Sequence, residues 1–144
     1  MKTRIAVLAI AASALSSASF AQNVNVKDLK IRGVTDLNAV DIAVTRPSEP
    51  KAAYKVIALG KGPEGSVVSV HTRYSDVTGW VYTARAIKCD TGKMKTLGSG
   101  ETVEGMLKSK ADPSWGALMD GSSATQVAGI ACERSGKRLD GIVR

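Results

Sequence analysis

The sequence is poor in aromatic residues, histidine and cysteine, and each shortage excludes a kind of site. Only 4% of the 144 residues are aromatic, and the chain has one histidine and two cysteines. A metal centre built on two histidines is therefore excluded, and a zinc site would need an unusual set of ligands. The cysteines do not form a C-x-x-C redox motif. We expect neither a metal nor a cofactor.

Catalytic motifs are also lacking. The sequence contains no G-x-S-x-G elbow, no G-x-x-x-x-G-K-[ST] phosphate-binding loop and no G-x-G-x-x-G fingerprint. Its carboxylates are scattered singly, so no acid–base pair can be nominated. His71 lies beside Arg73 on the polar side of an alternating segment, which favours a surface histidine over a catalytic one. We therefore expect that the protein is not an enzyme.

Long apolar runs are missing as well. The uncharged, mainly apolar segment Ile5–Leu15 is shorter than the roughly 20 residues that a membrane-spanning helix needs. Two basic residues precede this segment, and Ser19 and Ala21 place small side chains where a signal peptidase requires them. This order is typical of a secretory signal peptide, which we assign to residues 1–21.

The predicted signal peptide determines the expected location. Its alanine-rich apolar segment suits a bacterial export pathway. No cysteine precedes Cys89, so we do not expect the lipidated cysteine of a lipoprotein. After cleavage near Ala21, the chain is expected to be soluble and either periplasmic or secreted.

Basic residues outnumber acidic ones, by 20 to 13. Removing the two basic residues of the signal peptide lowers the formal net charge from +7 to about +5. The remaining basic residues include three groups: Lys88, Lys93 and Lys95; Lys108 and Lys110; Arg134, Lys137 and Arg138. None is interleaved with aromatic residues, so nucleic acid is not an expected partner. We interpret the groups as solvated faces, with a heparin- or lipopolysaccharide-like contact at residues 134–138 as the alternative.

The two cysteines predict one disulfide. In an oxidising compartment Cys89 and Cys132 are expected to pair, because only this pairing is possible. The bond closes a loop of about 40 residues, for which chain entropy predicts a stabilisation near 4 kcal/mol.

From Ala53 onward, alternating residues between turn-forming segments predict an antiparallel meander. We expect strands at Tyr54–Leu59, Val67–Tyr74, Trp80–Cys89 and Lys93–Leu97. The third of these carries apolar residues on both faces, so either both faces are covered or a bulge switches the alternation. Residues 22–52 are expected to form an extended N-terminal segment with at most one edge strand, within Leu37–Val44.

The periodicity becomes helical near the C-terminus. Ser123 and Gln126 fit a capping box, and Gly136 is the expected terminator. The side chains on the apolar side of this helix are mostly small: Ala124, Val127, Ala128, Ala131 and Cys132. We therefore predict an α+β domain over residues 53–144, in which a four- or five-stranded antiparallel meander carries one C-terminal helix, tied to the sheet by the disulfide.

Four residues are candidates for binding. Trp115 follows Asp112-Pro113-Ser114, and we interpret its ring first as a cover for the sheet edge and second as a ligand platform. The basic residues Arg134, Lys137 and Arg138 are the other three candidates.

The C-terminal half carries a characteristic order of features. They are a strand that runs into a cysteine (Tyr82–Cys89), a basic strand (Lys93–Leu97), Trp115, an Asp-Gly-Ser turn (Asp120–Ser122) and a short helix that ends in Cys132. In this order residues 65–133 resemble the surface-adhesin protein E family of small exported bacterial proteins. The resemblance implies an antiparallel sheet with a C-terminal helix attached by a disulfide, and binding of host matrix proteins. Adhesin members are displayed through a lipidated N-terminal cysteine, which this chain lacks.

Together these observations predict an exported, non-catalytic binding protein of the bacterial cell envelope, adhesin-like or partner-binding. Its partner would be a protein or an acidic envelope or matrix component, bound through the sheet face or the Trp115 segment. The alternative is an exported inhibitor of a hydrolase such as lysozyme, a role often filled by small disulfide-bonded β domains.

Overall fold

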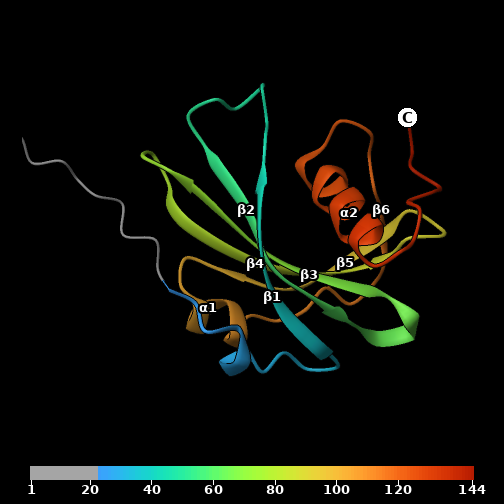
Figure 1. The fold of residues 1–144 in the computed structure, drawn as a ribbon, viewed down its shortest axis with the longest axis horizontal. Helices are drawn as coiled ribbons and strands as arrows, with labels where there is room; N and C mark the ends of the chain where they lie inside the picture. The colour runs from blue at the N-terminus through green and yellow to red at the C-terminus, as the bar shows by residue number, and fades with distance from the viewer. Residues whose placement is uncertain (1–22) are drawn as a thin grey trace, which may run out of the picture.

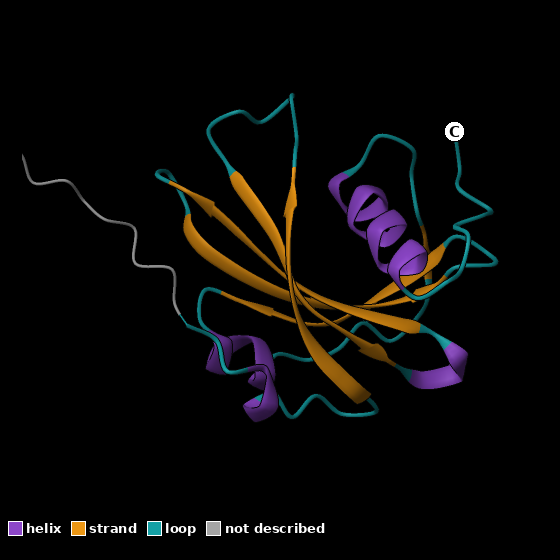
Figure 2. Cartoon of the chain, in the orientation of Figure 1, coloured by secondary structure: helices purple, strands orange, loops and turns teal. Residues whose placement is uncertain are grey.

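The computed structural model describes residues 23–144, which form one antiparallel sheet with helices on both sides (Figures 1 and 2). The predicted signal peptide, residues 1–21, lies outside the described residues. The strands are β1 (Thr35–Val44), β2 (Ala53–Lys61), β3 (Val67–Ser75), β4 (Gly79–Lys88), β5 (Lys93–Gly100) and β6 (Gly116–Ala117). The helices are α1 (Val103–Lys108) and α2 (Ser123–Arg134), with single 3₁₀ turns η1 (Val26–Asp28) and η2 (Pro63–Gly65).

Both faces of the sheet are covered, because successive residues of a strand point to opposite faces. On one face, Tyr82 packs in a cluster with Val26 of η1 and Met106 of α1. On the other face, Ile87 packs in a cluster with Ala128 of α2. We call these the α1 face and the α2 face, and Figure 1 shows the two helices on opposite sides of the sheet.

The two-sided covering answers the question that the sequence left open for β4. Its alternation runs without interruption from Gly79 to Lys88, and both faces are covered. A register shift does occur, but it lies in β5, because Ala84 pairs with Gly98 whereas Arg85 pairs with Thr96. Leu97 is therefore the extra residue of a bulge that leaves the side-chain alternation of β4 intact.

The predicted antiparallel meander and C-terminal helix are confirmed, but the sheet has more strands than the four or five that were predicted. Within residues 23–144 six strands pair in the order β1-β2-β3-β4-β5-β6. The expected edge strand at Leu37–Val44 is present as β1, which pairs with β2 and so belongs to the same sheet. The unexpected strand, β6, has only two residues, and so short a segment shows no periodicity in the sequence.

The edge strand β1 is irregular. Its pairing with β2 is interrupted by two register shifts, one between Thr35 and Asn38 and one between Ala39 and Ile42. Asp36 adopts a positive φ of 52°, a conformation that aspartate tolerates better than most residues. β1 therefore twists and bends along its length.

The N-cap of helix α2 lies one residue earlier than the sequence predicted. The N-cap is Ser122, whose hydroxyl accepts a hydrogen bond from the Thr125 backbone N–H at 3.1 Å. Gln126 does not complete a capping box, because its amide instead donates to the Thr45 carbonyl beside β1. The predicted terminator is confirmed, since Gly136 has a φ of +71° and donates to the Glu133 carbonyl. No helix within residues 23–144 has the length and apolar character needed to cross a bilayer.

The predicted disulfide joins the last turn of α2 to the end of β4. Cys89 and Cys132 have Cα atoms 5.9 Å apart, and both side chains are buried. The adjacent helix residues Ala128 and Ala131 are completely buried against the sheet. Small side chains at these positions allow the helix to approach the strands closely.

Removing the disulfide should destabilise the fold. For the double variant Cys89→Ala/Cys132→Ala we expect the free energy of unfolding to fall by about 4 kcal/mol, because the unfolded chain regains the entropy of an open loop. Alanine avoids placing a hydroxyl in a buried site. Urea unfolding measures the change, and reduced wild-type protein should match the variant. A loss below about 1 kcal/mol would contradict this prediction.

Candidate functional site

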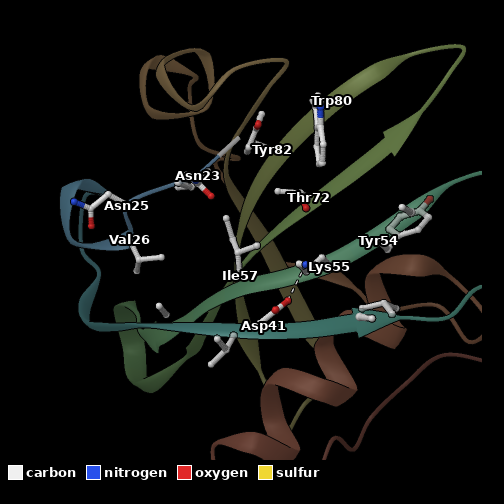
Figure 3. A pocket seen from close by; sticks show the side chains of 16 residues that line it. Asn23, Asn25, Val26, Asp41, Tyr54, Lys55, Ile57, Thr72, Trp80 and Tyr82 are labelled. Atoms are coloured by element: carbon white, nitrogen blue, oxygen red, sulfur yellow. Dashed lines mark ion pairs between the residues drawn. The ribbon is translucent and has the colours of Figure 1, made fainter. Parts of the chain in front are cut away.

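The α1 face holds a cavity of about 590 Å³ between the N-terminal segment and the sheet (Figure 3). Its apolar side chains come from four parts of the chain: Val24 and Val26; Val40, Ala43 and Val44 of β1; Ile57 of β2; and Trp80 and Tyr82 of β4. Polar groups at the cavity include Asn23, Asn25, Asp41, Lys55 and Thr72. The volume lies within the range of small-molecule binding sites, about 300–1,000 Å³.

One wall of the cavity belongs to a row of aromatic rings. Trp80 and Tyr82 are two residues apart on β4 and so share a face, and Tyr74 of β3 pairs directly with Trp80. The Trp80 ring centroid lies 5.0 Å from that of Tyr74 and 6.2 Å from that of Tyr82. Tyr82 is buried, which raises the pKa of its hydroxyl, whereas Trp80 remains partly exposed. The row thus gives the cavity an aromatic wall in which the ring of Trp80 is partly accessible.

The charges at the cavity neutralise each other. Lys55 of β2 forms an ion pair with Asp41 of β1, with Nζ and Oδ1 2.8 Å apart (Figure 3). The two side chains are 48% and 79% exposed, so water screens their attraction and the pair contributes little to stability. The cavity is thus mainly apolar, with no excess charge among its lining residues.

His71 is buried, so the expectation of a surface histidine is wrong. It lies opposite Val56 of β2 in the sheet, and Val56 packs against Val127 of α2. His71 therefore occupies the α2 face, which the sequence pattern had marked as polar. Burial first, and then the nearby Arg85 guanidinium, lower the pKa of His71 to about 3, so its imidazole is neutral at physiological pH.

The surroundings of His71 contain unpaired polar atoms. Nδ1 of His71, Oγ of Ser69 and Nε of Arg85 have no hydrogen-bond partner among the described residues. No hydrogen bond joins Ser69 to His71 in the described residues. The cluster is a set of buried polar groups under α2.

Trp115 is held by contacts within the chain. Its indole N–H donates to Oε2 of Glu64 at 2.7 Å, and Nζ of Lys88 lies 4.3 Å from its ring centroid. Nζ of Lys95 lies 5.7 Å from the same centroid. Hydrogen bonds from Lys88 and then from Trp115 keep the pKa of the Glu64 carboxyl below its usual value. These contacts fix the ring against the β4–β5 hairpin.

The predicted basic residues lie near Trp115 but among acidic side chains. Lys137 and Arg138 line a hollow of about 640 Å³ together with two further basic residues and three acidic ones: Lys88, Lys93, Glu64, Asp90 and Asp140. Arg138 pairs with Asp140 at 2.9 Å. Arg134 lies apart from this hollow and, with Lys137, lines a groove of about 1050 Å³ between α2 and β1. The structure therefore places the predicted basic residues in one region without concentrating positive charge there.

Comparisons with protein-family models, with curated proteins and with solved structures find no match to this chain. The resemblance of residues 65–133 to the surface-adhesin protein E family therefore remains a hypothesis.

Sequence reasoning did not identify the cavity as a site. Trp80 and Tyr82 are two residues apart in the predicted strand Trp80–Cys89, and two aromatic residues at this spacing were the available signal. The opposite wall, Val24–Val26, belongs to the segment that was predicted only to be extended, and one alternating pair of valines did not place it over the sheet.

The buried histidine should make stability depend on pH. His71 binds a proton near pH 6.5 in the unfolded chain but only near pH 3 in the folded chain, so acidification favours unfolding across this interval. We expect the wild type to lose about 1.4 kcal/mol per pH unit relative to His71→Asn below about pH 6. Urea unfolding at a series of pH values measures this slope. Parallel loss of stability in both proteins would show that His71 is not the cause.

Proposed function

We propose that this chain is an exported, non-catalytic binding protein of the bacterial cell envelope that binds its partner through the α1 face of the sheet. The observation that carries this proposal is the cavity of about 590 Å³ walled by Trp80, Tyr82 and Ile57. Large, mainly apolar cavities with a few polar groups are typical of binding sites.

The composition of the cavity favours binding over chemistry. No histidine, cysteine or serine lines it among the described residues, and its one ion pair is largely exposed to water. The surfaces it offers are aliphatic side chains and the partly exposed ring of Trp80. We therefore infer an uncharged, apolar or aromatic group as the part of the partner that enters the cavity.

The proposed location has support from two sources. The Cys89–Cys132 bond is of a kind that persists in oxidising compartments such as the periplasm and the extracellular space. The signal peptide predicted at residues 1–21 directs the chain to the same compartments. The resemblance of residues 65–133 to an adhesin family agrees with a role in binding.

The cavity should bind a small uncharged aromatic probe. We expect the fluorescence of N-phenyl-1-naphthylamine to rise on binding to the mature protein. Trp80→Ala should weaken binding about tenfold, since the loss of one aromatic contact costs about 1.4 kcal/mol. Ala43→Trp, which fills the cavity from β1, should weaken binding in the same way.

The chain offers a matched control in Trp115→Ala, which removes the other tryptophan and leaves the cavity intact. Circular dichroism checks that each variant folds. Equal binding by wild type, Trp80→Ala and Ala43→Trp would overturn the assignment of the cavity as the binding site.

Export and the alternative function need separate measurements. Fractionation of the native host should find the processed chain in the periplasm, on the surface or in the medium, and an unprocessed chain in the cytoplasm would contradict export. Retention in the periplasm would exclude the adhesin role.

Inhibition of lysozyme by the purified mature protein would replace our proposal with the hydrolase-inhibitor function.

A further inference from the structure

A second hollow, of about 690 Å³, lies on the α1 face between residues 31–33, β5 and the C-terminal end of α1. Its floor is apolar and contains Ile31, Leu97 and Met106. Met106 is buried, whereas Leu107 beside it is 38% exposed. The hollow thus presents apolar surface to solvent.

Glycines in β5 place α1 against this hollow. A Cβ atom at Gly98 would collide with the Met106 carbonyl oxygen, and one at Gly100 would lie 2.7 Å from the Met106 backbone nitrogen. Only glycine at these two positions allows α1 to lie directly on the strand. The Thr102 hydroxyl caps α1 by accepting a hydrogen bond from the Gly105 N–H at 3.0 Å. The close approach fixes where the basic residues at the end of α1 lie.

The side chains around the hollow carry positive charge only. Four basic residues line it, Arg32, Lys95, Lys108 and Lys110, and no acidic residue does. Within the described residues, Lys108 is the only one of the four in an ion pair, with Glu104 on the exposed surface of α1. The other three have no acidic partner within 4.0 Å in that part of the chain, although Nζ of Lys95 also lies 5.7 Å from the centroid of the Trp115 ring.

This arrangement brings together charges that the sequence keeps apart. Lys95 belongs to one basic group of the sequence, Lys108 and Lys110 to another, and Arg32 to neither. The region of Lys137 and Arg138 differs, because three acidic side chains share that hollow. The α1 hollow is therefore the better match for an anion.

We propose that this hollow binds the phosphate headgroup of an anionic lipid. Arg32, Lys95 and Lys110 would contact the phosphate, as such groups do at anionic membrane surfaces. Leu107 and the apolar floor would contact the first methylene groups of an acyl chain. A free phosphate ion would use the charges alone and gain nothing from the exposed Leu107, which is why a lipid fits the site better.

The test is co-sedimentation of the mature protein with phosphatidylglycerol vesicles, with phosphatidylcholine vesicles as the uncharged comparison. We expect binding to phosphatidylglycerol only, with an affinity that falls as salt shortens the Debye length. Lys95→Gln/Lys110→Gln should weaken binding on the order of tenfold, because each of these two positive charges attracts the protein to the anionic membrane surface. Leu107→Asn should weaken binding without changing its salt dependence.

The matched control is Arg134→Gln/Lys137→Gln, which removes the same charge from outside the hollow. It should bind vesicles as the wild type does. Equal loss in the two double variants would show attraction by net charge alone and would overturn the proposal. No binding of the wild type to phosphatidylglycerol would also overturn it.

A third experiment distinguishes a lipid from a free phosphate ion as the ligand of the hollow. Inorganic phosphate should displace the protein from vesicles no better than sodium chloride at equal ionic strength. Specific displacement by phosphate, together with unchanged binding of Leu107→Asn, would assign the hollow to a free anion and reject the lipid.

This site is distinct from the Trp80 cavity, so the two proposals fail separately. Trp80→Ala should keep vesicle binding, and Lys95→Gln/Lys110→Gln should keep binding of the naphthylamine probe. Loss of both activities in either variant would show that the two sites are not independent and would overturn their separate assignment.

Discussion

The close contact between α2 and the sheet is the interaction on which the structure depends. Ala128 and Ala131 are small enough for the helix to lie directly over the strands, and the Cys89–Cys132 bond holds its last turn there. The same contact removes polar groups from water, including the imidazole of His71 and the hydroxyl of Ser69. Leaving such groups unpaired costs free energy, and burial of the apolar helix stripe offsets that cost.

The α1 face is organised differently, because only short elements cover it. The 3₁₀ turn η1 has three residues and α1 has six, and between them they leave parts of the face without packed side chains. The cavity at Trp80 lies on one side of η1, and the basic hollow lies between residues 31–33 and α1. The sheet thus has one face that stabilises the fold and one whose incomplete covering leaves room for ligands.

Local features were predictable from the sequence, and features made by distant residues were not. The hairpins were predictable because glycine signals turns, and Gly79 and Gly92 do adopt positive φ. The disulfide followed from there being two cysteines. The burial of His71 was not predictable, because the alternation of a strand does not reveal which of its faces another element covers. The basic hollow was not predictable for a related reason, since Arg32 and Lys110 come to line one hollow only because α1 packs on β5.

The irregular course of β1 has a consequence for behaviour at high concentration. A regular edge strand presents a row of unpaired backbone groups on which another chain can assemble, and this is a common route to aggregation. The two register shifts of β1 and the left-handed backbone of Asp36 break up that row. The strand also carries charged side chains, because Asp36 and Asp41 form exposed ion pairs with Lys61 and Lys55 of β2, and charged residues disfavour strand addition at an edge. The protein therefore exposes an edge that is a poor template for strand addition.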